Sequence, residues 1–192
     1  MQSRFHEEFN RQAVDLVSNY YFAPTEVSKN HLLVEGKPID RIVVTGNTGI
    51  DALKTTVSSS YTHEVLTWSK DSRLLLMTAH RRENLGEPMR NMFRAVRRVV
   101  EQYPDVKVVY PVHLNPAVRE VASQELNGSD RIRLIDPLDV IDFHNIMAKS
   151  YFVLTDSGGI QEEAPSLGKP VLVMRDTTER PEGVKAGTLK LV

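Results

Sequence analysis

The feature that most constrains this 192-residue sequence is the alternation of short apolar runs with amphipathic segments. Apolar runs without polar alternation are typical of strands buried on both faces, as in a parallel sheet covered by helices. Repeated in this order, they predict an α/β fold built on a doubly wound parallel sheet with right-handed crossovers. The runs occupy residues 20–23, 42–44, 74–77, 106–112, 132–135, 151–154 and 171–174.

Two helices between these strands can be placed from the sequence. The first is predicted by an apolar stripe at helical spacing, with Pro88 in its first turn. The second begins at Asn115 and Pro116, a capping residue followed by proline, and ends near Gly128. Residues 58–72, polar around Trp68, are interpreted as a linker or surface helix. The stripe of the first helix comprises Met89, Met92, Phe93, Val96, Val99, Val100 and Tyr103.

The two ends of the sequence lack the neighbours that a complete sheet needs. Residues 1–46 have strand and helix patterns but too few partners, and residues 188–192 form a strand-like run with no following helix. We therefore expect a truncated chain. Residues 1–57 are interpreted as the remnant of an N-terminal domain with its crossover, and residues 58–192 as a C-terminal domain incomplete at its C-terminus. The loose N-terminal part should expose apolar surface and an unpaired edge, which favours aggregation.

Composition excludes several classes of partner and site. The net charge is −1 and basic residues are scattered among acidic ones, so no nucleic acid partner is expected. No apolar run approaches the roughly 20 residues of a membrane helix. The absence of cysteine excludes disulfides and thiolate metal sites and is compatible with the cytoplasm. No metal site is expected, because no convincing ligand spacing is found at His6, His31, His63 and His144.

The strongest candidate binding site is the turn at residues 155–164, TDSGGIQEEA, where a buried strand ends and a helix begins. Gly158 and Gly159 would let backbone N–H groups approach an anion, with the helix N-terminus adding positive charge. Ser157 can donate its hydroxyl, and Glu163 is suited to accept from a ribose diol. The alternative is a tight turn whose glycines serve chain geometry only. The turn matches neither the P-loop nor the dinucleotide fingerprint.

A second candidate follows another predicted strand, at residues 77–84. It brings His80, Arg81, Arg82 and Glu83 into one loop. Arginines bind phosphate through paired hydrogen bonds, and a histidine can protonate a leaving phosphate oxygen near neutral pH. A solvated charge cluster is the alternative, although the position after an apolar strand favours function.

Three further segments also follow strands. His113, within residues 110–116, is as a lone histidine more often structural than chemical. The backbone at Pro137 and Leu138, together with Phe143, could hold a flat base, but a phenylalanine on a helix face is by default a core residue. The polar loop at residues 175–182 could line the same cleft or be plain surface.

Taken together, these segments resemble the non-hydrolysing UDP-N-acetylglucosamine 2-epimerases. The resemblance rests on HRREN at 80–84, YPVHLNP at 110–116, the run from 155 to 183, FAPTE at 22–26 and VTGN at 44–47, and covers the chain from about residue 7. It implies two Rossmann-like domains of the glycosyltransferase-B type with UDP-GlcNAc in the cleft between them. This chain would be the C-terminal, UDP-binding half of a cytoplasmic homodimeric enzyme of cell-surface polysaccharide biosynthesis.

The resemblance also assigns residues. It places Ser157, Gly158 and Gly159 on the diphosphate, Glu163 on the ribose, and Phe143 with the Pro137 and Leu138 backbone on the uracil. It makes His80 and Glu7 catalytic, with Arg11 nearby in the cleft, although His6 stands where the family has proline. It assigns Arg81, Glu83 and His113 to a regulatory UDP-GlcNAc site. No cofactor or metal is implied.

The implied reaction is elimination followed by readdition, giving UDP-N-acetylmannosamine. A base removes the proton at sugar C2 while UDP leaves C1, and UDP then adds back to the glucal. Because other family carboxylates lie in the N-terminal domain, we expect the chain to bind UDP weakly and not to epimerise. The alternatives are a glycosyltransferase of the B-type fold, a hydrolysing epimerase, and a non-catalytic nucleotide-sugar-binding module.

Overall fold

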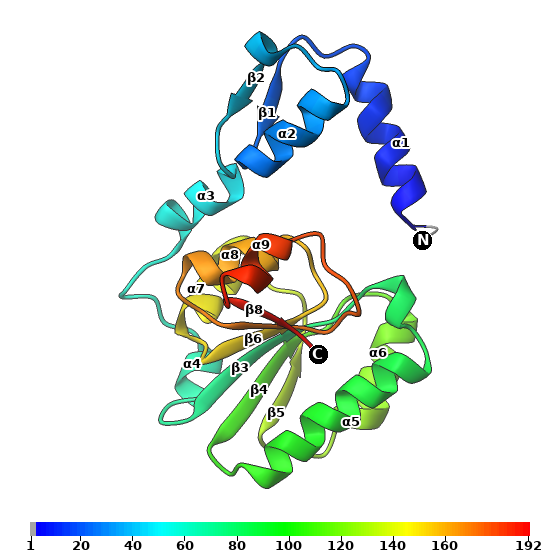
Figure 1. The fold of residues 1–192 in the computed structure, drawn as a ribbon. Helices are drawn as coiled ribbons and strands as arrows, with labels where there is room; N and C mark the ends of the chain where they lie inside the picture. The colour runs from blue at the N-terminus through cyan, green and yellow to red at the C-terminus, as the bar shows by residue number, and fades with distance from the viewer. Residues whose placement is uncertain (1–2) are drawn as a thin grey trace. The chain divides into compact units, whose positions relative to one another are not determined.

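The computed structural model describes the backbone of residues 3–192 and the side chains of residues 8–192. The chain forms two compact units, Met1–Thr48 and Gly49–Val192, and each is described here by itself (Figure 1). The units divide after Thr48, whereas the sequence analysis counted the crossover up to residue 57 with the N-terminal domain. The division into compact units does not assign the crossover to a domain, so the boundary after residue 57 stays a prediction.

The N-terminal unit is a small α/β segment. It contains α1 (Ser3–Asp15), β1 (Tyr21–Ala23), α2 (Glu26–Val34), the 3-10 turn η1 (Ile39–Arg41) and β2 (Ile42–Val44). β1 and β2 pair in parallel, and the Thr25 hydroxyl caps α2 by accepting from the Ser28 N–H at 3.2 Å. A sheet of two strands buries little, and several large apolar side chains of this unit are exposed, as expected from the sequence. They include Phe9, Leu16, Val17, Phe22 and Val34.

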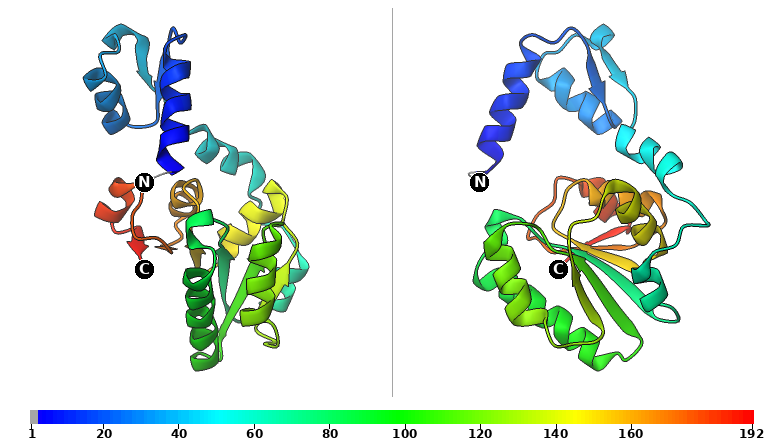
Figure 2. Two further views of the ribbon diagram at one scale, coloured as in Figure 1. Left: turned by 90° about the vertical axis from the view of Figure 1, so that its right-hand side faces the viewer. Right: turned by 180° about the vertical axis from the view of Figure 1, so that it is seen from behind.

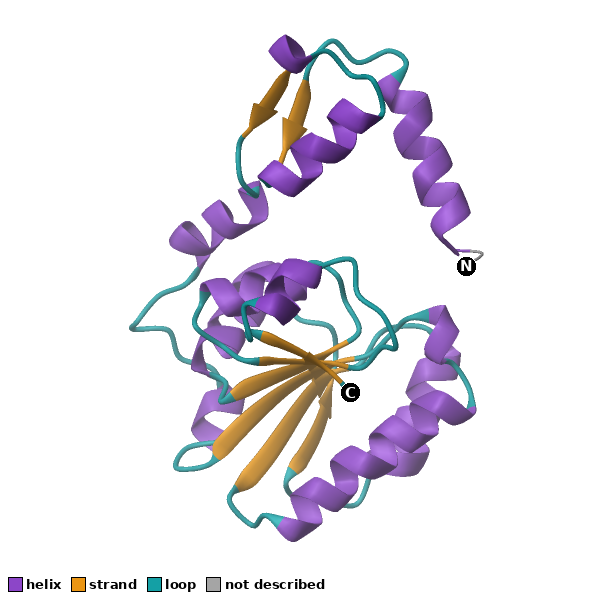
Figure 3. Cartoon of the chain, in the orientation of Figure 1, coloured by secondary structure: helices purple, strands orange, loops and turns teal. Residues whose placement is uncertain are grey.

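The C-terminal unit is built on one parallel sheet with strand order β5-β4-β3-β6-β7-β8, drawn as a fan of arrows in Figure 3. Its strands are β3 (Arg73–Thr78), β4 (Val106–Pro111), β5 (Ile132–Ile135), β6 (Phe152–Thr155), β7 (Val171–Val173) and β8 (Leu189–Leu191). The chain moves outward in one direction from β3 to β5 and then returns to the other side of β3 with β6. The doubly wound parallel sheet predicted from the sequence is therefore confirmed.

Helices cover both faces of this sheet (Figure 2). One face carries α5 (Glu87–Gln102) and α6 (Pro116–Leu126), and the other carries α7 (Val140–Lys149), α8 (Ile160–Ser166) and α4 (Glu64–Trp68). The end of α3 (Thr48–Thr56) is joined to α7 by the hydrogen bond from the Asn145 amide to the Thr56 carbonyl. The short elements η2 (Arg82–Asn84) and α9 (Pro181–Lys185) lie in the loops after β3 and β7. Along β3 the side chains alternate between the faces: Leu75 and Met77 join the α5 side, and Leu74 and Leu76 the α8 side.

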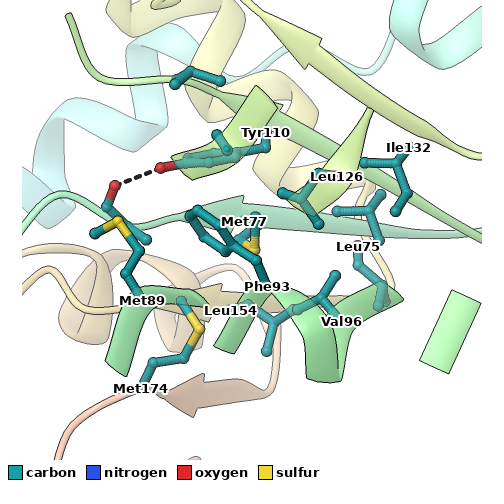
Figure 4. Packing of buried hydrophobic residues seen from close by; sticks show 14 of the residues in the cluster. Leu75, Met77, Met89, Phe93, Val96, Tyr110, Leu126, Ile132, Leu154 and Met174 are labelled. Atoms are coloured by element: carbon teal, nitrogen blue, oxygen red, sulfur yellow. Dashed lines mark hydrogen bonds between the residues drawn. The ribbon is translucent and has the colours of Figure 1, made fainter. Parts of the chain in front are cut away.

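The core on the α5 side is centred on two aromatic rings. Phe93 of α5 and Tyr110 of β4 are fully buried, with ring centroids 5.5 Å apart and planes tilted by 58°. The Tyr110 hydroxyl donates to the carbonyl of Ala79 at 2.5 Å (Figure 4). Burial, and secondarily the charge of Asp156, raise the pKa of this hydroxyl, so it remains a donor. The core thus fixes the backbone immediately before His80.

Two sequence expectations need correction. Val99 and Tyr103, expected on the buried stripe of α5, are 39% and 44% exposed. Val99 lines an apolar groove of about 330 Å3 beside β6 and β7, and the Tyr103 ring packs against the Arg73 guanidinium, 5.6 Å from the ring centroid. Residues 58–72 contain α4, but they are not purely surface, because Val65 is fully buried.

The two neighbouring valines of α5 provide a matched test of this packing. Val100 is 1% exposed and Val99 is 39% exposed, so both substitutions to alanine change helix propensity equally but differ in buried volume. Val100→Ala should lower the free energy of unfolding by about 1.5–3 kcal/mol, and Val99→Ala by about 0.5 kcal/mol or less. Urea denaturation measures both, and equal losses would contradict the described burial.

Candidate functional site

The candidate site lies where β3 and β6 end side by side. In a doubly wound sheet the point where strand order reverses opens a crevice beyond the carboxyl ends of the strands. Thr78 of β3 is paired with Thr155 of β6, and their hydroxyl oxygens are 2.7 Å apart. The loop carrying His80 and the turn carrying Ser157 therefore start from adjacent points of the sheet.

The turn after β6 does not need glycine for its backbone shape. Neither Gly158 nor Gly159 has a positive φ, and Gly159, the residue before α8, has φ −65° and ψ −44°. A Cβ built on Gly158 would meet Arg81 Nη2 at 3.8 Å, and one on Gly159 would meet Glu163 Oε1 at 3.8 Å, both ordinary contacts. Chain geometry therefore does not require glycine at either position, and the role of the two glycines in binding stays a prediction.

What the glycines provide is uncovered backbone. Within the described residues, no acceptor meets the backbone N–H of Gly158 or Gly159. The Ser157 N–H, by contrast, donates to the Thr155 hydroxyl at 2.9 Å, which fixes the start of the turn. Consecutive free N–H groups before a helix, with no side chains above them, are suited to an anion. The guanidinium of Arg81 lies beside them and adds positive charge.

Asp156 fastens the two loops together. Its fully buried carboxylate accepts through Oδ2 from the backbone N–H groups of His80 and Arg81, at 2.9 and 2.8 Å, and from the Asn84 amide at 3.2 Å. Arg81 Nε in turn donates to the backbone oxygen of Asp156 at 2.9 Å. The position of His80 relative to the glycine turn is therefore set by hydrogen bonds.

The His80 side chain is partly exposed to solvent, and its ring is held by two neighbouring residues. Its side chain is 41% exposed, and Nδ1 lies 3.3 Å from Asp156 Oδ1. Its ring stacks on that of His113, with centroids 5.5 Å apart and planes 16° from parallel. His113 Nδ1 accepts from the Asn115 N–H at 3.1 Å, so the neutral ring of His113 carries its proton on Nε2. The structure thus brings three predicted residues, His80, Arg81 and His113, to one place.

The polar loop after β7 belongs to the same neighbourhood. Arg175, whose side chain is 6% exposed, forms two hydrogen bonds to Glu179 at 2.8 and 2.9 Å, and its Nε is 3.4 Å from Glu83. The loop is also joined to α8 by a hydrogen bond from the Thr178 hydroxyl to Gln161. These contacts join residues 175–182 to Glu83 and to α8, so the loop is not plain surface, and its lining of the cleft stays a prediction.

The residues predicted for the base and the ribose lie on the α7 side. Pro137 and Leu138 line a cavity of about 600 Å3, but Phe143 is not among its lining residues and instead packs against the core. Glu163, in the first turn of α8, is partly buried, and its Oε2 is 3.8 Å from Nε2 of His144. His144 is itself buried, with Nδ1 2.8 Å from the Thr56 hydroxyl.

The two predicted residues of the N-terminal unit belong to α1. Arg11 is surrounded by carboxylates, with nitrogen–oxygen distances of 2.5 Å to Glu8, 2.8 Å to Asp15 and 2.8 Å to Glu35. The hydrogen bond from Arg11 lowers the pKa of Glu8 from 4.5 to about 2. The side chain of Glu7 lies outside the described residues. The roles of Glu7 and Arg11 therefore stay predictions.

Sequence reasoning gave no role to Asp156, Asn84, Thr155 or His144, which the structure places within this network. One signal was available: an aspartate directly after a buried strand, beside a loop rich in N–H donors on the neighbouring strand. The part of the chain that the structure describes contains no group of three or more histidine, aspartate or glutamate side chains that could hold a metal. It also contains no helix long and apolar enough to cross a membrane.

The comparisons with known proteins agree with this geometry. The family model described as UDP-N-acetylglucosamine 2-epimerase matches residues 1–192. The chain belongs to this family. A UDP-N-acetylglucosamine 2-epimerase of Bacillus subtilis is 64% identical over 189 residues, which cover 98% of this chain and 50% of the relative. The chain thus spans about half the length of the curated relatives it matches.

Solved structures give the same fold. A co-structure of Staphylococcus aureus MnaA with UDP superposes with a TM-score of 0.95 at 59% identity, covering 98% of this chain and 52% of that one. The UDP-GlcNAc 2-epimerase of Neisseria meningitidis, bound to UDP-GlcNAc, gives 0.89 at 46% identity, covering 100% of this chain and 54% of that one. The resemblance inferred from the sequence is therefore confirmed, and so is the Rossmann-like α/β fold.

The Arg175–Glu179 pair predicts a pH dependence of this loop. The hydrogen bonds from Arg175 lower the pKa of Glu179 from its ordinary 4.5 to about 2. Because this pKa is depressed on folding, the pair stabilises the loop above about pH 4.5 and loses that effect as the pH falls toward 2. Carboxyl NMR titration of Glu179 should show a midpoint near 2, and Arg175→Gln should return it toward 4.5. A midpoint unchanged by Arg175→Gln would contradict the pairing.

Proposed function

We propose that this chain is the UDP-binding half of a UDP-GlcNAc 2-epimerase, an isomerase that interconverts UDP-GlcNAc and UDP-ManNAc. The observation that carries the proposal is the pair of adjacent loops after β3 and β6. They present uncovered N–H groups at Gly158 and Gly159 beside the Arg81 guanidinium. Uncovered N–H groups next to a guanidinium match the charge and hydrogen-bonding needs of a diphosphate.

The nucleotide would extend from this turn along the edge of the sheet. The diphosphate would bind the Gly158 and Gly159 N–H groups and the Ser157 hydroxyl, and the ribose diol would donate to Glu163. The uracil would bind against the backbone of Pro137 and Leu138, at the cavity of about 600 Å3. Phe143, which packs against the core behind this region, would then shape the base site rather than form its wall.

The reaction would need UDP to leave and return without diffusing away. A base removes the proton from sugar C2, the C1–O bond breaks with its electron pair passing to UDP, and a glucal remains. UDP then adds back to C1 and a proton returns to C2 from the opposite face, giving the C2 epimer. His80 and the glycine turn would stabilise the charge of the departing diphosphate, and Glu7 would act on the sugar with Arg11 nearby.

A regulatory role is proposed for Arg81, Glu83 and His113. The His113 ring stacks on the His80 ring, so a second UDP-GlcNAc bound to His113 would touch the same stack as the substrate diphosphate. Contact through one stack is a short physical route between two ligand sites. We also propose that the whole enzyme has the glycosyltransferase-B two-domain arrangement, is a cytoplasmic homodimer and serves cell-surface polysaccharide synthesis.

Calorimetric titration of UDP tests the binding site. Ser157→Ala and Gly158→Ala should both fold. The first removes only a hydroxyl group, and the Cβ added at Gly158 makes only ordinary contact. Ser157→Ala should weaken UDP binding by about tenfold, corresponding to one lost hydrogen bond to a charged group. Gly158→Ala keeps its N–H group and should weaken binding because the added methyl group occupies the space above the turn that the diphosphate would fill. Ser166→Ala, at the other end of α8, is the matched control and should bind UDP normally. Unchanged affinity in both site variants would show that UDP does not bind at this turn.

An activity assay tests the division of labour. The chain spans about half the length of its relatives, and we propose that the carboxylates acting on sugar C2 lie partly in the unmatched half. The purified chain should therefore bind UDP but convert no UDP-GlcNAc into UDP-ManNAc, measured by chromatography of the nucleotide sugars. Detectable UDP-ManNAc would show that this half is catalytically sufficient, and transfer of GlcNAc to an acceptor would favour a glycosyltransferase instead.

A further inference from the structure

The two oxygens of the buried Asp156 carboxylate have different partners. Oδ2 is saturated by the backbone N–H groups of His80 and Arg81 and by the Asn84 amide, at 2.8–3.2 Å. Oδ1 is buried and has no hydrogen-bond partner among the described residues. A buried carboxylate oxygen left without a donor is destabilising and needs a physical explanation.

One side chain is placed to supply that donor. Nδ1 of His80 lies 3.3 Å from Oδ1, within ion-pair distance but not aligned as a hydrogen bond. A small rotation of the imidazole would align an Nδ1–H with the oxygen. Hydrogen bonds of this kind are often long or misaligned in ligand-free sites and tighten when the ligand binds.

We propose that Asp156 is the positioning residue of His80: it holds the imidazole in the Nδ1–H tautomer and reserves Nε2 for the ligand. The statement about the ligand rests on the proposed function, in which His80 stabilises the departing diphosphate, and it adds that Nε2 faces an oxygen of that group. When Nε2 also carries a proton, the Asp156 carboxylate balances the imidazolium charge while Nε2–H donates to that oxygen.

The surroundings of His80 support a fixed ring. The Tyr110 hydroxyl holds the carbonyl of Ala79, the residue before His80, and Asp156 holds the His80 N–H. The His113 ring stacks on one face of the imidazole. Because the backbone is held on both sides and one ring face is covered, rotation of the imidazole ring is restricted. The tautomer therefore decides whether the exposed ring nitrogen is a hydrogen-bond donor or an acceptor toward a ligand.

The competing account is that Asp156 only joins the loop to the turn. Asp156→Asn separates the two accounts because it is nearly isosteric. Its amide oxygen can accept the same three hydrogen bonds, while its NH2 group faces His80 and forces Nδ1 to become the acceptor. The variant therefore keeps the hydrogen bonds that hold the loop but changes the His80 tautomer from Nδ1–H to Nε2–H.

Imidazole 15N NMR of the chain at pH 8 reads the tautomer directly, with the His80 signals assigned by their loss in His80→Gln. The wild-type chain should show the Nδ1–H tautomer and Asp156→Asn the Nε2–H tautomer. Asp142→Asn is the matched control: Asp142 is the carboxylate beside His63, at 3.9 Å, and its removal should leave the His80 signals unchanged. An Nε2–H tautomer in the wild-type chain overturns the proposal, even if the variant fails to fold.

A double-mutant cycle on UDP affinity shows whether Asp156 acts through His80. Asp156→Asn should weaken UDP binding about tenfold in the wild-type background, because a neutral amide cannot balance an imidazolium whose Nε2–H donates to the diphosphate. It should have no further effect in the His80→Gln background. Equal losses in both backgrounds would mean that Asp156 acts only on the turn, which overturns the proposal. If the wild-type chain binds no UDP, the proposed function fails, while the tautomer measurement still decides the role of Asp156.

Discussion

The buried carboxylate of Asp156 holds together the loops on which the site depends. It ends one strand of the sheet and accepts hydrogen bonds from the backbone that ends the neighbouring strand. Asn84 extends the connection to the carbonyl of Met174 at 3.4 Å, next to the Arg175–Glu179 pair. Three loops from three adjacent strands are thereby joined by polar contacts in a partly buried region, where such contacts are stronger than in water.

The sheet beneath these loops has a different task. β3 is buried on both faces, and its side chains alternate between two apolar clusters that also anchor α5 on one side and α8 on the other. This arrangement holds the middle of β3 by apolar packing, whereas polar side chains join the strand ends. The strands therefore position the loops that carry the candidate site, which is the usual arrangement in open α/β sheets.

Local pattern was enough to predict the strands, the capped start of α6 and the loops that carry the candidate site, because each depends on residues close in sequence. Contacts made at long range could not be predicted. The exposure of Val99 depends on what covers its part of α5, and the role of Asp156 depends on a partner 76 positions away. The sequence could not show whether the backbone shape requires glycine at positions 158 and 159, whereas the backbone angles and Cβ distances show that it does not.

The strand order also governs how this molecule emerges from the ribosome. β3, β4 and β5 can pair in the order in which they are made, but the other edge of β3 stays open until β6 has been synthesised, with Thr155 following Thr78 by 77 positions. During that interval an apolar strand edge is unprotected and open to pairing with other chains. The turn at Ser157–Gly159 does not form until the same strand has docked, so a ligand bound there could not stabilise the nascent chain at the stage when its open edge is most exposed.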